Sequence, residues 1–268
     1  TGTNHGVATA LMCREAGLDC TVLLFDQPVT ATVRRNLCLM QALGARLEYR
    51  GTLARTVASF YLHPLRLRRD SYFLFAGGSS VEGTLGFVNA ALELRDQVRA
   101  GELPEPEVIV CPVGSSATLA GLTIGCALAG LDTRVEGVRV APARLGPFAA
   151  CTPETVGKLM EQTMTFLDRH LDAELPPVPR PVLHDAYFGS GYGEATGEGE
   201  QAIARFGEHG FELEPTYTGK AAAAYLDALT TTEGPVVFWH TYNSRDTSAL
   251  AQEASLDQMP APLRSLLD

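Results

Sequence analysis

The chain has 268 residues, of which 46% are hydrophobic and 19% charged, enough apolar material for a large core and too much for a disordered protein. Its formal net charge of −10 argues against nucleic acid or an anionic membrane as the main partner, and no apolar run of about 20 residues predicts a membrane span. The six cysteines and six histidines are scattered without metal-ligand spacing, which favours a reducing, cytoplasmic location and no metal site.

Short apolar segments rich in β-branched residues alternate along the chain with longer segments of helical periodicity. The predicted strands are residues 19–25, 45–49, 71–75, 108–110, 134–140 and 235–240. The predicted helices are residues 7–16, 32–43, 52–69, 85–99, 119–129, 153–170, 198–206 and 221–229. This alternation predicts an α/β fold with parallel sheets. We expect a small domain over residues 1–74 and a large domain over residues 75–268.

Residues 108–121 (VIVCPVGSSATLAG) are predicted to form a strand, a tight turn of small residues and the start of a helix. The residues of this turn are Gly114, Ser115, Ser116, Ala117 and Thr118. Backbone N–H groups converge in such a loop, and the positive end of the helix dipole points toward it. The sequence is neither a Walker A loop nor the G-x-G-x-x-G fingerprint. Two interpretations stay open, a phosphate-binding loop and an ordinary strand-to-helix connection.

Three further loops carry polar or phenolic side chains. Their sequences are TGTNHG at 1–6, GSGYG at 189–193 and TYTGK at 216–220. The first places a hydroxyl, an amide and an imidazole where a helix begins; they can cap it, or its N–H groups can bind a carboxylate. The candidate side chains of the three loops are Thr3, Asn4, His5, Tyr192, Tyr217 and Thr218.

Some of these residues also have a purely structural interpretation. His5 fits a histidine that supports a site without taking part in catalysis, and Tyr217 fits a packing tyrosine whose hydroxyl is hydrogen-bonded. Lys220 is expected to cap or solvate the start of a helix, and Lys158 to lie exposed on a helix.

All these loops in one order resemble the fold-type II pyridoxal-phosphate enzymes, and within them the 1-aminocyclopropane-1-carboxylate deaminase/D-cysteine desulfhydrase family. The motifs are TGTNHG at 1–6, GGSS at 77–80, GSSATLAG at 114–121, GYG at 191–193, YTGK at 217–220 and FWHT at 238–241. The first also resembles the asparagine loop of threonine and cysteine synthases, whereas YTGK after GYG favours the deaminase/desulfhydrase branch. The resemblance implies a tryptophan-synthase-β-like fold with two three-layer α/β domains, and pyridoxal 5′-phosphate as cofactor.

The resemblance also implies roles for residues that contact the cofactor. Residues 114–118 would hold its phosphate, with Ser115 and Thr118 adding hydroxyl contacts to those of the backbone N–H groups. Asn4 would hydrogen-bond the phenolic oxygen of the cofactor, and Thr218 would face its pyridine nitrogen.

Other roles concern the substrate. The N–H groups around Thr3, Asn4 and His5 would receive the substrate carboxylate, and Thr3 stands where the family has a serine that assists substrate binding or proton transfer. Tyr192 and Tyr217 would supply hydroxyls near the substrate as acid/base or orienting groups.

The resemblance implies a lyase or deaminase that acts on a small amino acid. The deaminases have a glutamate at the position of Thr218, and a neutral hydroxyl there favours β-elimination, as in D-cysteine desulfhydrase. The alternatives are ring opening as in 1-aminocyclopropane-1-carboxylate deaminase, β-replacement as in cysteine and threonine synthases, and a lysine-less protein that only binds a cofactor or phosphate. A homodimer is expected from the resemblance alone.

The family's cofactor-bonding lysine lies upstream of the asparagine loop, in a Gly-Asn-Lys segment. This chain begins at that loop, and its two lysines, Lys158 and Lys220, stand in other contexts. We therefore expect the N-terminal segment with that lysine to be missing from this chain, and the chain alone to be inactive. A second departure is the pair Tyr242-Asn243, where relatives often have two glycines after His-Thr.

Overall fold

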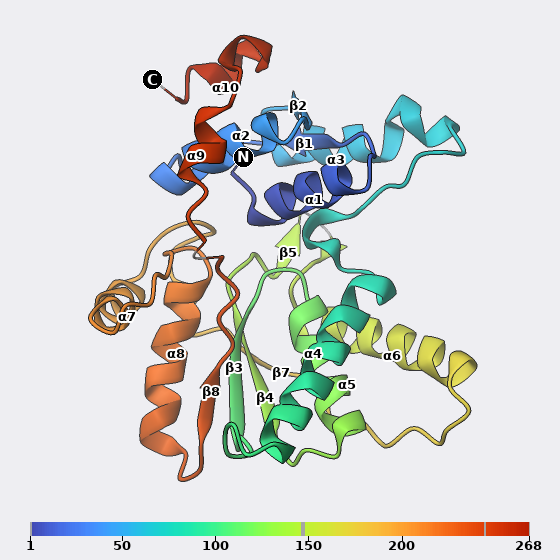
Figure 1. Cartoon of the computed structure of the whole chain (residues 1–268), viewed down its shortest axis with the longest axis vertical. Coiled ribbons are helices and arrows are strands. Elements are labelled where there is room, and N and C mark those ends of the chain that lie inside the picture. The colour runs from blue at the N-terminus through green and yellow to red at the C-terminus, as the bar shows by residue number, and fades with distance from the viewer. Residues whose placement is uncertain (1, 146–147, 244, 268) are drawn as a thin grey trace. The chain divides into compact units, whose positions relative to one another are not determined.

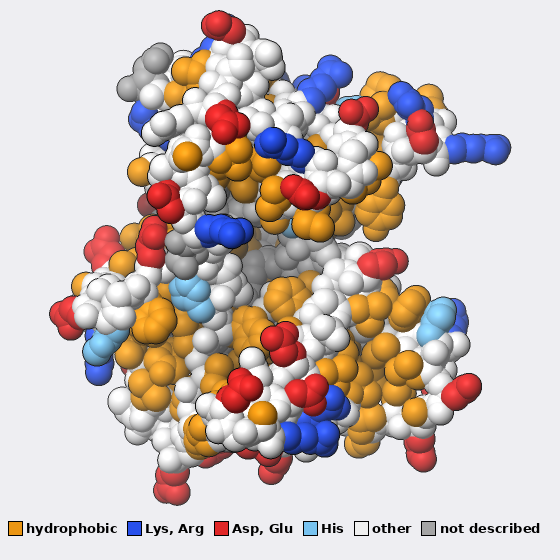
Figure 2. Space-filling model, in the orientation of Figure 1, with side chains coloured by type: hydrophobic (Ala, Val, Ile, Leu, Met, Phe, Trp, Pro, Cys, Tyr) orange, Lys and Arg blue, Asp and Glu red, His pale blue; other side chains and the backbone are white. Residues whose placement is uncertain are grey.

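The computed structural model describes residues 2–145, 148–243 and 245–267, so the first residue of the TGTNHG motif lies outside it. The chain divides into two compact units (Figure 1). Unit 1 consists of Thr1–Leu74 and Arg245–Asp268, and unit 2 of Phe75–Ser244. Acidic and basic side chains are interspersed on the face shown in Figure 2. Within the described residues, no helix has both the length and the apolar character needed to cross a membrane.

Unit 1 has a sheet of two parallel strands with helices around it. The strands are β1 (Thr21–Leu24) and β2 (Arg46–Tyr49). The α-helices are α1 (Asn4–Glu15), α2 (Ala31–Ala42), α3 (Leu53–Leu62), α9 (Ser248–Gln252) and α10 (Ala261–Arg264). The 3₁₀ helices are η1 (Pro64–Leu67) and η3 (Leu256–Gln258). The core of the unit includes Leu24, Leu37 and Met40.

The C-terminal segment belongs to unit 1, which corrects the prediction that residues 75–268 form one domain. Leu263 of α10 is fully buried in the core of unit 1, and Leu250 of α9 packs against the same cluster. A domain prediction that divides the chain at one point cannot show that the C-terminal segment packs on the first unit. An apolar helix residue packs wherever a complementary core lies.

Two other predictions for unit 1 are wrong. Residues 71–75 do not form a strand: no strand among the described residues pairs with this apolar run, and Tyr72 and Phe75 stay 76% and 46% exposed. The helix predicted over 52–69 ends at Leu62, because His63 precedes Pro64 and takes an extended conformation. The short helix η1 follows.

Unit 2 contains a parallel four-stranded sheet in the order β7-β4-β3-β8. Its strands are β3 (Val108–Val113), β4 (Arg134–Arg139), β7 (Val182–His184) and β8 (Val236–Phe238). A short antiparallel pair is formed by β5 (Arg144–Leu145) and β6 (Phe148–Ala149). The helices are α4 (Val81–Arg99), α5 (Ala117–Ala129), α6 (Pro153–His170), α7 (Gly197–Gly207) and α8 (Thr218–Thr231), with the 3₁₀ turn η2 (Ala76–Gly78).

Helices cover both faces of this sheet, with α4, α5 and α6 on one side and α8 on the other (Figure 1). Every residue of the central strand β3 is buried. Ile109 packs into the core with α4 and α5, whereas Val108 and Val110 pack into the core with α8. The predicted α/β class with parallel sheets is therefore confirmed. Strand β7, which the sequence interpretation missed, is only three residues long and follows a proline-rich segment.

Candidate active site

The turn between β3 and α5 leaves the start of that helix uncapped. Ser116 is the N-cap residue, and its side chain makes no capping hydrogen bond. It has φ 80° and ψ −32°, in the region of positive φ that non-glycine residues seldom adopt. The first turn of α5 carries no acidic side chain either. The N–H groups of Ala117 and Thr118 are therefore free of side-chain acceptors in the described structure, and the helix dipole adds partial positive charge.

Other long helices of the described chain are capped from within. A threonine or serine hydroxyl accepts a hydrogen bond from a first-turn N–H at six of them: Thr3 at α1, Thr30 at α2, Thr52 at α3, Ser80 at α4, Thr152 at α6 and Thr196 at α7. Against this background, the start of α5 is suited to an anion that is not part of the chain.

The GGSS loop predicted at 77–80 lies directly against this turn. The Ser79 hydroxyl donates a hydrogen bond to the backbone oxygen of Ser115, and the Ser115 hydroxyl donates to the oxygen of Gly77 at 3.4 Å. Gly77 has φ 75°, and a Cβ at this position would collide with the Ser115 side chain. The GGSS loop therefore braces the turn between β3 and α5 by close backbone approach.

On the other side of the turn lies a pair of tyrosines. A Cβ on Gly114 would lie 3.1 Å from Cε1 of Tyr217, so the absence of a side chain lets that ring approach. The hydroxyls of Tyr217 and Tyr192 are 2.5 Å apart, and their rings meet edge to face with centroids at 6.1 Å. Burial is the main cause that raises the pKa of both phenols, well above the ordinary value for Tyr217. Both hydroxyls stay protonated at neutral pH.

Glu214, which sequence reasoning missed, occupies the start of α8. Its carboxylate is 6% exposed and accepts hydrogen bonds from the N–H groups of Thr216 at 2.8 Å, Tyr217 at 2.7 Å and Thr218 at 2.9 Å. The N–H of Glu214 in turn donates to the Thr218 hydroxyl at 2.9 Å, and Thr218 is fully buried. The signal was an acidic residue just before Pro215 and an alanine-rich helix, a position where a carboxylate complements the helix dipole.

Lys220 does not solvate or cap the helix start, which corrects the sequence prediction. Its side chain is fully buried, and Nζ donates to the backbone oxygens of Phe188 at 2.6 Å and Gly191 at 3.1 Å. The first half of α8 is packed on every side, so a residue in its first turn cannot reach solvent. Lys158, by contrast, is exposed on α6 as predicted.

The residues predicted in unit 1 surround the start of α1. The Thr3 hydroxyl accepts from the N–H of Gly6 at 3.1 Å. Asn4 is exposed, and its Oδ1 accepts from Nδ2 of Asn36 at 2.7 Å, which leaves the Asn4 amide N–H groups as donors. Asn36, a buried residue of α2 that sequence reasoning missed, therefore orients Asn4. His5 is half-buried, and burial lowers its pKa.

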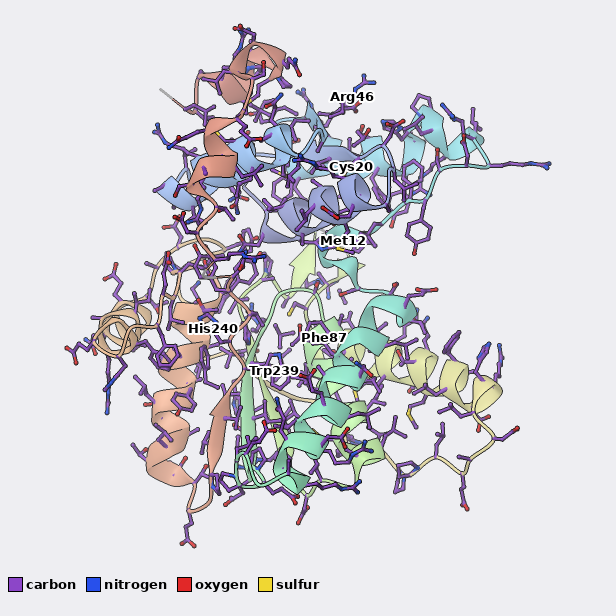
Figure 3. The ribbon with its side chains drawn as sticks, in the orientation of Figure 1. Met12, Cys20, Arg46, Phe87, Trp239 and His240 are labelled. Atoms are coloured by element: carbon purple, nitrogen blue, oxygen red, sulfur yellow. The ribbon has the colours of Figure 1, made fainter. Side chains whose placement is uncertain are left out.

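The segment after β8 follows the edge of the sheet. Figure 3 labels Trp239 and His240, the first two residues beyond the strand. The N–H of Trp239 donates to the oxygen of Val110 at 2.8 Å, and His240 Nε2 lies 3.0 Å from the oxygen of Glu212. Hydrogen bonds thus fix the FWHT motif at the end of β8, and the buried Tyr242 follows it.

The donors around the turn fit the phosphate of pyridoxal phosphate. Unpartnered helix N–H groups and the hydroxyls of Ser115 and Thr118 match the several acceptor oxygens of a phosphate monoester. The absence of a side chain at Gly114 lets Tyr217 approach this turn, and the Thr218 hydroxyl lies buried at the start of α8, where it accepts from the N–H of Glu214. Unit 2 therefore contributes Gly114, Ser115, Ser116, Ala117, Thr118, Tyr192, Tyr217 and Thr218 to one neighbourhood of loops, whereas Thr3, Asn4 and His5 lie together in unit 1.

A parallel sheet covered on both faces, with an uncapped helix after its central strand, defines an α/β protein of the kind that binds phosphorylated cofactors. The family model for pyridoxal-phosphate dependent enzymes matches residues 1–241, and the chain belongs to that family. Its cofactor is pyridoxal phosphate, and the fold is that of the fold-type II enzymes, as the loop motifs predicted.

Solved structures of other proteins share this fold. The structure of an ACC deaminase homologue is 26% identical to this chain, with a TM-score of 0.74 over 96% of this chain and 76% of the other. A threonine deaminase from T.th. is 20% identical, with a TM-score of 0.59 over 92% of this chain and 77% of the other. Serine racemase from Dictyostelium discoideum is 15% identical, with a TM-score of 0.60 over 92% and 75%.

Proposed function

We propose that the protein is a pyridoxal-phosphate-dependent lyase or deaminase that acts on a small amino acid by β-elimination, as a D-cysteine desulfhydrase does. The observation that carries the proposal is the uncapped start of α5, whose N–H groups are free of side-chain acceptors in the described structure and lie beside the turn of Ser115 and Ser116. Further support comes from the likeness to the ACC deaminase homologue and from the tyrosine pair next to Gly114.

The residues divide the work as follows in this proposal. The start of α5 and the hydroxyls of Ser115 and Thr118 hold the cofactor phosphate, and the amide N–H groups of Asn4 bind its phenolic oxygen. When bound, the cofactor supplies an electron sink for the bond that breaks at the substrate Cα. Thr218, with a neutral hydroxyl, is the residue that faces the pyridine nitrogen. The nearby Glu214 carboxylate is bound by three backbone N–H groups of its own segment.

The other residues bind the substrate and move its protons. Backbone N–H groups around Thr3 and His5 receive the substrate carboxylate, and the Thr3 hydroxyl assists proton transfer beside it. The raised pKa of Tyr217 and Tyr192 keeps both phenols protonated, so the pair can donate a proton to a leaving thiol or orient it. For cysteine the reaction is cysteine plus water to pyruvate, ammonia and hydrogen sulfide, which balances without an oxidant.

The test is a product assay on the full encoded protein loaded with pyridoxal phosphate. The substrates are D-cysteine, L-cysteine, D-serine, L-threonine and 1-aminocyclopropane-1-carboxylate, and the products measured are keto acid, ammonia and sulfide. We expect pyruvate, ammonia and sulfide in equal amounts from one enantiomer of cysteine. Formation of 2-oxobutanoate from the cyclopropane substrate would instead favour ring opening. Absence of keto acid from all five substrates would contradict the proposal.

A second candidate is a protein that binds the cofactor without catalysis. One observation favours it: of the two lysines in this chain, Lys158 is exposed on α6 and Lys220 is bound to two backbone oxygens, so neither is placed to bond the cofactor. Borohydride reduction of the full encoded protein with pyridoxal phosphate, followed by peptide mass spectrometry, decides between the candidates. A modified lysine peptide supports the enzyme, and its absence together with saturable binding supports the binding protein.

A further inference from the structure

Lys220 occupies an unfavourable position for a cation. It stands in the first turn of α8, where the positive end of the helix dipole opposes an ammonium group, and its side chain is fully buried. A buried charge is tolerated only where hydrogen bonds or opposite charges compensate the loss of water. The contacts of the Lys220 ammonium group therefore indicate its role in the structure.

Those contacts close a turn of the chain. Nζ donates to the backbone oxygen of Phe188 at 2.6 Å and to that of Gly191 at 3.1 Å, and it lies 5.1 Å from the centroid of the Phe188 ring. Gly189 and Ser190, the residues between the two acceptors, are exposed, and Gly189 has φ 71°. Tyr192 follows Gly191 directly, so Lys220 holds the backbone next to the tyrosine.

A second cation holds the beginning of the same segment. Arg139, at the end of β4, pairs with Asp185 at 2.5 Å and donates to the oxygen of Ala141 at 2.9 Å. Its guanidinium lies 4.3 Å from the centroid of the Phe188 ring. The ring of Phe188 therefore makes two cation–π contacts, one with Arg139 from β4 and one with Lys220 from α8, and each contact is favourable.

We propose that Lys220 is a positioning residue, whose ammonium fixes the backbone at Phe188 and Gly191 so that the Tyr192 hydroxyl stays within hydrogen-bond distance of the Tyr217 hydroxyl. Gly189 and Ser190 are exposed, and Thr196 packs against Gly189; the two backbone contacts of Lys220 are what fix the chain next to Tyr192. The inference rests on the proposed function only in so far as both tyrosines are assigned to its site.

The charges around Lys220 agree with this role. Burial lowers its pKa, and Arg139 acts in the same direction, whereas the carboxylates of Glu194 and Glu214 oppose the shift. These two acids come from the end of the glycine loop and from the start of α8, the two segments that the lysine joins.

The test follows the two phenols by NMR on protein labelled with ¹³C at Cζ of tyrosine, without cofactor or substrate. The signals of Tyr192 and Tyr217 are identified among the eight tyrosines with Tyr192→Phe and Tyr217→Phe. In the unsubstituted protein we expect both to titrate above the pH of an exposed tyrosine. In Lys220→Met, which keeps the length but removes the charge, Tyr192 should titrate at the pH of an exposed tyrosine. Lys158→Met is the matched control and should leave both signals unchanged.

A second variant deletes only the ring between the two cations and keeps both backbone acceptors of Lys220. Phe188→Ala should shift the Tyr192 titration in the same direction by a smaller amount. If Lys220→Met does not fold, Lys220→Gln, whose side chain is too short to reach both backbone oxygens, decides. A folded Lys220→Met, or in its absence Lys220→Gln, with an unshifted Tyr192 overturns the inference. Loss of thermal stability with an unshifted Tyr192 means that Lys220 only stabilises α8. Failure of the product assay with a shifted Tyr192 overturns the proposed function alone.

Discussion

Helices α5 and α8 begin in the same unit, and the backbone N–H groups at the two helix starts meet different partners. At α8 the buried carboxylate of Glu214 accepts three backbone hydrogen bonds, so the helix start is satisfied by the chain itself. At α5 the N-cap Ser116 makes no capping bond, and no acidic residue follows in the first turn. A helix start without an internal anion is suited to an external one, and this difference is the reason for which we propose ligand binding at α5 and a structural role for Glu214 at α8.

The variant with the largest expected effect places a negatively charged side chain at the start of α5. In Thr118→Asp the carboxylate stands in the first turn, where it complements the helix dipole and repels a phosphate. We expect pyridoxal phosphate to bind about 100-fold more weakly, or about 2.7 kcal/mol, as like charges a few ångströms apart require. The free energy of unfolding should be unchanged or higher by about 0.5 kcal/mol. Equilibrium dialysis and urea unfolding measure the two effects.

Thr118→Asn is the control for shape, since it removes the hydroxyl without adding a charge. Its affinity should fall by about tenfold at most, the worth of one hydrogen bond. Pyridoxal, which lacks the phosphate, should bind both variants equally. Equal losses of pyridoxal phosphate binding in the Asp and Asn variants would show that charge at α5 is not what holds the ligand.

The converse change removes the negative charge at the start of α8. Glu214→Gln keeps the shape but removes the charge, and one of its two terminal groups is a donor that faces other donors. The free energy of unfolding should fall by about 2 kcal/mol, as expected for hydrogen bonds to a buried charged group. Glu212→Gln, an exposed neighbour, should change it by less than about 0.5 kcal/mol. The comparison fails if the two variants are equally stable in urea.

The smallest expected effect concerns the brace behind the α5 turn. Gly77→Ala adds a methyl group at φ 75° that collides with Ser115, so we expect a loss of about 1–2 kcal/mol in unfolding free energy and weaker phosphate binding. Gly86→Ala, in the exposed middle of α4 with open space around its Cα, should gain about 0.5–1 kcal/mol. A gain at both positions would show that the GGSS loop does not brace the turn.

The sequence predicted the central elements of unit 2 well, because their patterns are local. The buried run of β3, the small residues after it and the apolar helix α5 appear in the sequence in the order in which they pack. The strand predicted at 71–75 was wrong, since an apolar run forms a strand only where a neighbouring strand can pair with it. The three-residue strand β7 has too short a pattern to be recognised.

The residues of the candidate site likewise divide into those that the sequence indicated and those that only the structure revealed. Thr3, Asn4, Tyr192, Tyr217 and Thr218 were found as members of motifs, and their roles stay proposals. Their partners were missed: Glu214 lies three positions before Tyr217, and Asn36 lies 32 positions from Asn4. The buried Lys220 was assigned to solvent. Their contacts depend on which helix faces which loop, and no local pattern states that.

The sequence by itself determined the α/β class, the family motifs and the small-residue turn after β3, because strand pattern, turn chemistry and helix periodicity are all written in neighbouring residues. Only the tertiary structure decided that residues 245–267 return to unit 1, that Glu214 fills the start of α8 and that Lys220 is buried beneath the tyrosine loop. Each of these depends on burial and on hydrogen-bond partners from distant segments. A buried polar group is bonded to whatever the fold brings to it, and that is settled in three dimensions.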